Sequence, residues 1–188
     1  MKLSTRLVRR VGATAAAITA ALLIPAVALA APGRATSPAA APGCTEAQLQ
    51  SWIGLPGDGT AGTTFYELEI SNVSTRTCTL LGFPGVSAVS QNGKQVGSPA
   101  RRNNSHPVRL ITLGRGATAH VDLGIVDVFA FPAATCHPVT ATGLRVFAPN
   151  NFKAQVIQFS FKACQQAGPK FLSVSPAVAG TGIPLFSS

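Results

Sequence analysis

Two stretches of the chain, residues 66–71 and 157–162, alternate strictly between apolar and polar side chains. In the first stretch, Glu67 and Glu69 lie between the apolar residues. A period of two residues is typical of a β-strand that buries one face. Both stretches are therefore predicted to be half-buried strands, and the two glutamates are expected on the polar face of the first.

Turn-forming residues separate the other apolar stretches. Pro-Gly-Asp-Gly at residues 56–59 predicts a turn after a first strand, and Asn92-Gly93 is a strong β-hairpin signal. Residues 171–175 are expected to form the last strand, which Pro176 ends. About seven to nine short strands without a convincing helix predict an all-β fold, an immunoglobulin-like antiparallel β-sandwich.

The N-terminal residues predict an export signal. Four basic residues lie within the first ten positions, residues 11–29 are apolar and uncharged, and Ala28-Leu29-Ala30 offers a cleavage site. The rival interpretation is a membrane anchor, because the apolar stretch approaches the roughly 20 residues of a transmembrane helix. Its Ala- and Thr-rich composition and the cleavage site favour a signal peptide over residues 1–30. No transmembrane helix is then expected in the mature chain, and the export route, Sec or twin-arginine, stays open.

Composition divides the rest of the chain. Residues 31–43 form an Ala/Pro/Gly-rich linker, a β-sandwich domain is expected over residues 44–178, and residues 179–188 form a C-terminal tail. Cleavage would leave 158 of 188 residues. It would remove four of fifteen basic residues and none of six acidic ones, so the net charge falls from +9 to +5. With charged residues only 11 % of the chain, nucleic acid is not an expected partner.

Four cysteines follow the signal, and none is spaced as C-x-x-C, so the usual zinc and redox motifs are absent. In an oxidising compartment they predict two disulfides, which can pair in three ways. An immunoglobulin-like strand order places Cys44 and Cys78 at one end of the sandwich, and Cys136 and Cys164 at the other. The predicted pairs are therefore Cys44–Cys78 and Cys136–Cys164.

Several short motifs together resemble a known family. They are Glu69-Ile-Ser-Asn72, Cys78-Thr-Leu-Leu-Gly-Phe-Pro-Gly-Val86, Gly97-Ser-Pro-Ala100, Leu113-Gly-Arg-Gly-Ala117 and Leu172-Ser-Val-Ser-Pro176. Over about residues 44–178 the chain resembles the actinobacterial secreted domain of unknown function 4232 family. The resemblance implies an exported all-β domain without an established activity, and it supplies no catalytic residues. Many members look like lipoproteins, but this chain lacks a lipobox before Cys44, so lipid anchoring is not expected.

Sequence motifs for catalysis are absent, since no G-x-S-x-G, S-x-x-K or H-E-x-x-H occurs. His120 and Asp122 share one face of a predicted strand, where an imidazole and a carboxylate can bind a metal or act as acid–base partners. A solvated polar face is the favoured interpretation. No catalytic residue, metal ligand or cofactor is therefore predicted.

Four arginines, Arg101, Arg102, Arg109 and Arg115, lie within fifteen positions that hold no acidic residue. Guanidinium groups recognise phosphate and carboxylate groups, so these residues form a candidate anion-binding cluster. A basic loop exposed to solvent is the favoured alternative.

These observations predict a secreted protein, extracellular or cell-wall associated, that is not an enzyme. We expect a non-catalytic interaction module of the cell envelope or the extracellular space, whose ligand the sequence does not identify. An anionic envelope polymer and a protein partner are both open. A secreted hydrolase without a recognisable motif, a small-ligand carrier and an inhibitor are the alternatives. A pocket with convergent polar groups would favour an enzyme or carrier, and exposed binding faces would favour the interaction module.

Overall fold

The computed structural model describes residues 40–104 and 107–182. The predicted signal peptide, residues 31–39 of the linker and residues 183–188 of the tail lie outside the described residues. In chain order the elements are η1 (Glu46–Gln48), β1 (Leu49–Thr60), β2 (Thr63–Asn72), β3 (Cys78–Leu81), β4 (Gly85–Val89), β5 (Gln95–Val96), β6 (Arg101–Arg102), β7 (Leu110–Leu113), β8 (Thr118–Val126), η2 (Val128–Ala130), α1 (Ala133–Cys136), β9 (Pro138–Phe147), β10 (Ala154–Cys164), β11 (Leu172–Val174) and β12 (Val178–Ala179).

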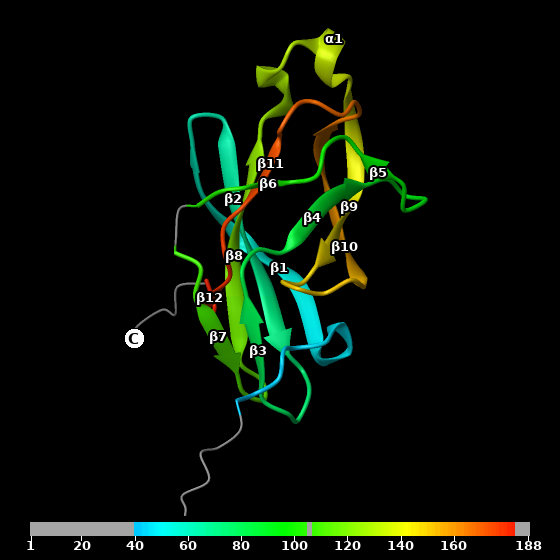
Figure 1. The fold of residues 1–188 in the computed structure, drawn as a ribbon. Coiled ribbons are helices and arrows are strands. Elements are labelled where there is room, and N and C mark those ends of the chain that lie inside the picture. Colours follow the sequence, from blue (N-terminus) through cyan, green and yellow to red (C-terminus); the bar gives the residue numbers. More distant parts are fainter. Residues whose placement is uncertain (1–39, 105–106, 183–188) are drawn as a thin grey trace, which may run out of the picture. The chain divides into compact units, whose positions relative to one another are not determined.

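Two β-sheets enclose an apolar core (Figure 1). The larger sheet has the order β1–β2–β8–β11–β6, with β12 also paired to β8, and the smaller has the order β10–β9–β4–β5. Strands β3 and β7 form a separate pair. The described strands pair antiparallel except for β6, which runs parallel to β11. The predicted all-β sandwich is confirmed. Twelve strands are described rather than seven to nine, because β5, β6 and β12 have only two residues each.

The apolar faces of the two clearest predicted strands meet across the core. In β2, Leu68 and Ile70 are fully buried. The Tyr66 ring of β2 meets the Phe159 ring of β10 edge-on, with ring centroids 4.9 Å apart. Such an aromatic pair adds to the hydrophobic gain of burial. The alternation in the sequence therefore identifies one strand of each sheet and the side that each buries.

The predicted turn at residues 56–59 is wrong. Strand β1 continues to Thr60, and its register against β2 shifts on either side of Pro56. The chain instead reverses at Ala61 and Gly62, which have positive φ angles of 46° and 79°. Gly and Pro suit a β-bulge as well as a turn, so composition alone does not tell the two apart.

The predicted hairpin at Asn92-Gly93 is confirmed and connects β4 to β5. Gly93 has a positive φ of 75°. The carboxamide oxygen of Asn92 accepts hydrogen bonds from Ser90 Oγ (2.6 Å) and Lys94 N (3.2 Å). The Asn92 side chain thus supplies an acceptor within the turn, as asparagine commonly does.

Both predicted disulfides are confirmed. Cys44–Cys78 joins the segment before η1 to the start of β3, and Cys136–Cys164 joins α1 to the end of β10. Figure 1 shows β3 and α1 at opposite ends of the sandwich. One bridge therefore closes each end, which is the arrangement that the strand-order argument predicts.

Candidate functional site

The four predicted arginines are all exposed, and Arg115 lies apart from Arg101 and Arg102. Arg101 and Arg102 form β6, which pairs with β11 and thereby lies near the far end of β8. Arg115 lies in the turn that precedes β8. At about 3.3 Å per residue along a strand, Arg115 is roughly 20 Å from β6. Arg109 precedes β7 and is not in this turn.

Arg102 lies over an aromatic ring. Its guanidinium carbon is 5.2 Å from the centroid of Phe83, within the range of a cation–π contact. Both side chains line a hollow of about 490 Å³, whose other walls come from the ends of β3 and β9 and from the turn after β9. Because Arg102 stays exposed, the contact with Phe83 positions its charge without burying it.

Phe152 projects from the turn between β9 and β10 and is 95 % exposed. Two asparagines hold this turn in place: Asn150 Nδ2 donates to Leu81 O (3.2 Å), and Asn151 Nδ2 donates to Cys44 O (3.1 Å). Asn150 has a positive φ of 59°, which asparagine tolerates better than most residues. An exposed phenylalanine is thus presented on a turn that is bonded to a disulfide-linked residue.

Leu81 and Leu110 form an exposed apolar pair beside this turn. They lie opposite each other in the β3–β7 ladder and are 42 % and 65 % exposed. Leu81 lines the hollow described above and also a second hollow, of about 410 Å³, which Leu110 lines as well. Val108 is half exposed and lines the first hollow. These exposed or hollow-lining residues are called the Phe152 surface: Leu81, Phe83, Arg102, Val108, Leu110 and Phe152.

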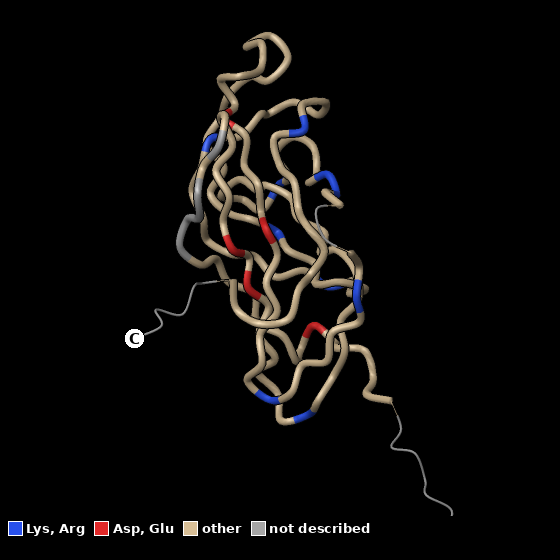
Figure 2. The backbone as a smooth tube through the Cα atoms, turned by 90° about the vertical axis from the view of Figure 1, so that its left-hand side faces the viewer, with Lys and Arg blue, Asp and Glu red and all other residues tan. Residues whose placement is uncertain are grey.

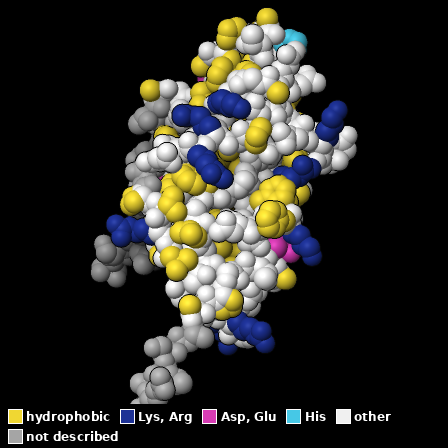
Figure 3. Space-filling view, in the orientation of Figure 1, with side chains coloured by type: hydrophobic (Ala, Val, Ile, Leu, Met, Phe, Trp, Pro, Cys, Tyr) yellow, Lys and Arg dark blue, Asp and Glu magenta, His cyan; other side chains and the backbone are white. Residues whose placement is uncertain are grey.

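Figure 3 shows hydrophobic and basic side chains gathered on the face that carries β3, β6 and β7. Four of the eight large apolar side chains that are exposed in the described residues belong to the Phe152 surface. Burying one such side chain contributes roughly 1.5–3 kcal/mol. Contiguous exposed apolar patches commonly mark interaction sites. The Phe152 surface is therefore the strongest candidate binding site.

Sequence reasoning missed the apolar members of this surface. Apolar residues are usually assigned to the core, and only the preceding Pro149-Asn150-Asn151 signals that Phe152 follows a turn. Leu81 and Leu110 lie in four-residue strands, and strand pairing decides which of their faces stays open. That pairing is not visible in the local pattern of residues.

His120 and Asp122 share one face of β8 as predicted, and the structure places two carboxylates on the same face. Glu69 of β2 lies opposite His120, and Glu67 lies opposite Asp122. Figure 2 shows acidic positions gathered in the middle of this side of the molecule. Glu67 and Glu69 share the polar face of β2 as predicted, but Glu69 is fully buried rather than exposed on it.

Residues 178–182 cover this acidic face. Strand β12 pairs with β8, His120 Nδ1 donates to Gly180 O (2.9 Å), and Gly182 N donates to Glu69 Oε1 (2.9 Å). Residues 179–182, the described part of the predicted tail, therefore pack on the larger sheet. The carboxylate of Glu69 and the imidazole of His120 bind the backbone of the same chain.

The pKa of the Glu67 carboxyl is raised by its surroundings. Burial raises the pKa of Glu67 above its ordinary value, the negative charge of Asp122 raises it further, and His120 lowers it in part. Like charges directly opposite each other in a sheet are destabilising. Ionisation of Glu67 therefore opposes the folded arrangement of this face.

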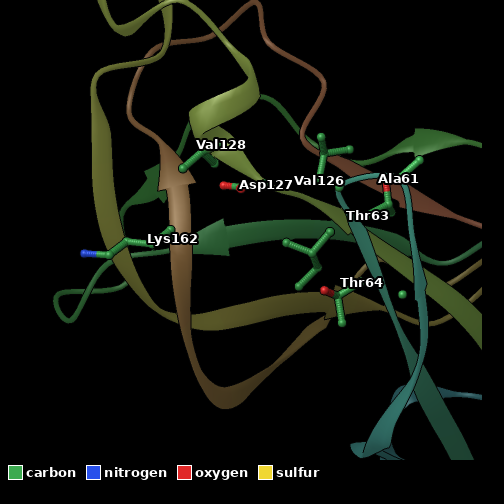
Figure 4. Close-up of a pocket in the computed structure, with 10 residues that line it drawn as sticks. Ala61, Thr63, Thr64, Val126, Asp127, Val128 and Lys162 are labelled. Carbon is green, nitrogen blue, oxygen red and sulfur yellow. The ribbon is translucent and has the colours of Figure 1, made fainter.

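A third hollow, of about 430 Å³, lies beside the β1–β2 hairpin (Figure 4). Lys162 lines it, but Figure 4 shows its amine pointing away from Thr64 and the hairpin. Lys162 Nζ donates to Thr140 Oγ1 (3.1 Å), and the Asp127 carboxylate accepts from Phe129 N (3.0 Å). The two charged side chains that line this hollow thus make their contacts elsewhere and do not converge on it.

Within residues 40–104 and 107–182, no group of three or more His, Cys, Asp or Glu side chains is placed to hold a metal ion. In the same part of the chain, no helix has the length and apolar character needed to span a membrane.

The fold and its bridges define an all-β domain with two disulfides. The chain matches the model of the family described as Domain of unknown function (DUF4232) over residues 44–178, so it belongs to that family. The resemblance seen in the sequence motifs is thereby confirmed. Comparison with curated proteins finds no match.

Proposed function

We propose that this chain is an exported, non-catalytic interaction module, acting outside the cell or at the cell envelope, and that the Phe152 surface is its binding site. The basic and apolar N-terminal sequence and the two disulfides support export. The observation that carries the proposal is the gathering of four exposed apolar side chains with Arg102 on one surface. Aromatic and arginine side chains dominate the energetics of protein-binding surfaces.

An anionic envelope polymer is the second candidate ligand. The exposed guanidinium groups of Arg101 and Arg102 favour it, because guanidinium binds phosphate and carboxylate groups. Binding of this kind depends mainly on charge and weakens as salt screens the attraction. It also leaves Phe152 without a role.

Sedimentation with cell-envelope particles tests the proposed function. Purified, oxidised wild-type protein is compared with Phe152→Ser and with Phe129→Ser. Phe129 is a matched control because it is 70 % exposed but lies in η2, away from the Phe152 surface. Substitutions of exposed side chains usually leave folding intact. We expect Phe152→Ser to lose most of the sedimenting fraction and Phe129→Ser to keep it. Equal retention of Phe152→Ser and wild type, or no retention of wild type, would contradict the proposal.

A further inference from the structure

We infer that the Phe152 surface binds a segment of a partner protein that carries an apolar side chain and a carboxylate close together. The carboxylate meets Arg102, and the apolar side chain packs against Phe152. This inference rests on the proposed binding role of the surface and adds the chemistry of the partner.

The guanidinium of Arg102 is oriented and has open N–H donors for binding a carboxylate. The contact of its guanidinium with the Phe83 ring restricts its orientation, while the exposed edge of the group retains its N–H donors. Within the described part of the chain, no acidic side chain pairs with Arg102 and no hydrogen bond engages its guanidinium. A planar guanidinium with open N–H groups matches the two oxygens of a carboxylate. A partner carboxylate therefore supplies the acceptor that this part of the chain lacks.

The charge around the surface selects the same kind of partner. Neither of the two hollows of the Phe152 surface is lined by an acidic residue among those described. The acidic positions of β2 and β8 instead lie on the face that the C-terminal residues cover. Electrostatic potentials of opposite sign across an interface favour the correct partner, and like charges across it disfavour a wrong one. An acidic segment is therefore attracted, and a basic one is repelled.

The apolar side chains argue against a purely ionic ligand. A polyanion can neutralise Arg102 but leaves Phe152, Leu81 and Leu110 in water. An apolar side chain that packs against Phe152 removes apolar surface from water, a contribution that a sugar–phosphate chain cannot supply. The partner must therefore be amphipathic, with acidic and apolar groups side by side.

The shape of the surface favours a protein segment over a lipid bilayer. The two hollows adjoin, since both are lined by Leu81, Asn150 and Asn151. Together they form a concave track with Phe152 at its edge. A chain of side chains can fill such a track, whereas a flat lipid surface contacts only the protruding groups. Hydrogen bonds from the two asparagines already order the turn, so binding does not have to order it.

Selection from a phage-displayed library of random twelve-residue peptides tests this inference on the purified, oxidised protein. We expect the enriched peptides to place Asp or Glu within two positions of Phe, Leu or another large apolar residue. Fluorescence anisotropy then measures the affinity of the most enriched peptide. Arg102→Gln and Phe152→Ser should each weaken binding about tenfold, which corresponds to about 1.4 kcal/mol. The matched controls Arg115→Gln and Phe129→Ser, exposed residues outside the surface, should change it less than about twofold.

The other occupants give different outcomes. Enrichment of basic or neutral peptides, no enrichment, or equal binding by Phe152→Ser overturns the inference. The inference is also overturned if no peptide is enriched and the protein instead binds anionic phospholipid vesicles or a polyphosphate polymer, with that binding abolished by Arg102→Gln. If the protein binds such vesicles or such a polymer but no peptide, the proposed function still stands provided that Phe152→Ser no longer sediments with cell-envelope particles. It falls together with the inference if neither peptides nor envelope particles bind.

Discussion

Glu67 and Glu69 lie two positions apart on one face of β2, yet they meet different surroundings. Glu69 lies opposite His120 and accepts a hydrogen bond from Gly182 N. Glu67 lies opposite Asp122, whose negative charge adds to the effect of burial on the pKa of Glu67. Local alternation predicts that both share a face, but only the position of the C-terminal residues shows that this face is covered.

The raised pKa of Glu67 predicts a pH-dependent stability. The folded protein binds the proton of the Glu67 carboxyl more tightly than the unfolded chain does. Protonated Glu67 therefore contributes to the stability of the fold below the ordinary pKa of 4.5, and this contribution is lost as the pH rises through the raised pKa. Glu67→Gln keeps the shape without the charge. Its free energy of unfolding should exceed that of wild type at about pH 7, and the difference should shrink toward about pH 4.

Denaturant unfolding of both proteins across this pH range provides the measurement. Asp127→Asn is the matched control, because Asp127 is exposed and lies outside this face. It should not reproduce the pH-dependent difference. A Glu67→Gln variant that is less stable than wild type at about pH 7, with the gap closing at low pH, would show that the ionised carboxylate stabilises the fold.

At the scale of elements, the predictable strands are those whose two faces differ. In β10 the exposed and partly buried residues alternate along residues 156–161, as the sequence indicates. Strands β6 and β12 have two residues each, which is too short to show a period. The bulges of β1 are not predictable either, because Pro56 and its neighbouring glycines have the composition of a turn. Of the candidate site, the sequence identifies Arg102 but not the apolar residues around it.

The two disulfides should contribute comparably to stability. They close intervals of 34 and 28 residues, so the chain-entropy relation gives about 3–4 kcal/mol for each. Replacing either pair by alanine, Cys44→Ala with Cys78→Ala or Cys136→Ala with Cys164→Ala, should lower the free energy of unfolding by about that amount. Denaturant titration of the two double variants beside wild type measures the loss. A loss below about 1 kcal/mol for either pair would show that its bridge barely constrains the unfolded chain.

At the scale of the whole described domain, the acidic positions of β2 and β8 lie apart from the Phe152 surface. The acidic positions of β2 and β8 lie under the chain's own C-terminal residues, whereas the Phe152 surface is open and carries Arg102 (Figures 2 and 3). The Cys44–Cys78 disulfide and the two asparagine side chains fasten the elements that border this surface. A rigid, preformed surface reduces the ordering cost of association. The fold thus supports binding without a large rearrangement.

Site-specific photocrosslinking in the producing cells tests the central claim, that the Phe152 surface contacts a partner protein, most directly. The photoreactive residue p-benzoylphenylalanine is placed at position 152 in one variant and at position 129 in a control variant. Both native side chains are exposed phenylalanines, so each substitution preserves an aromatic group in water. We predict a discrete protein adduct after irradiation of the position 152 variant and none from the position 129 variant. No adduct from position 152, or the same adducts from both positions, would contradict the claim.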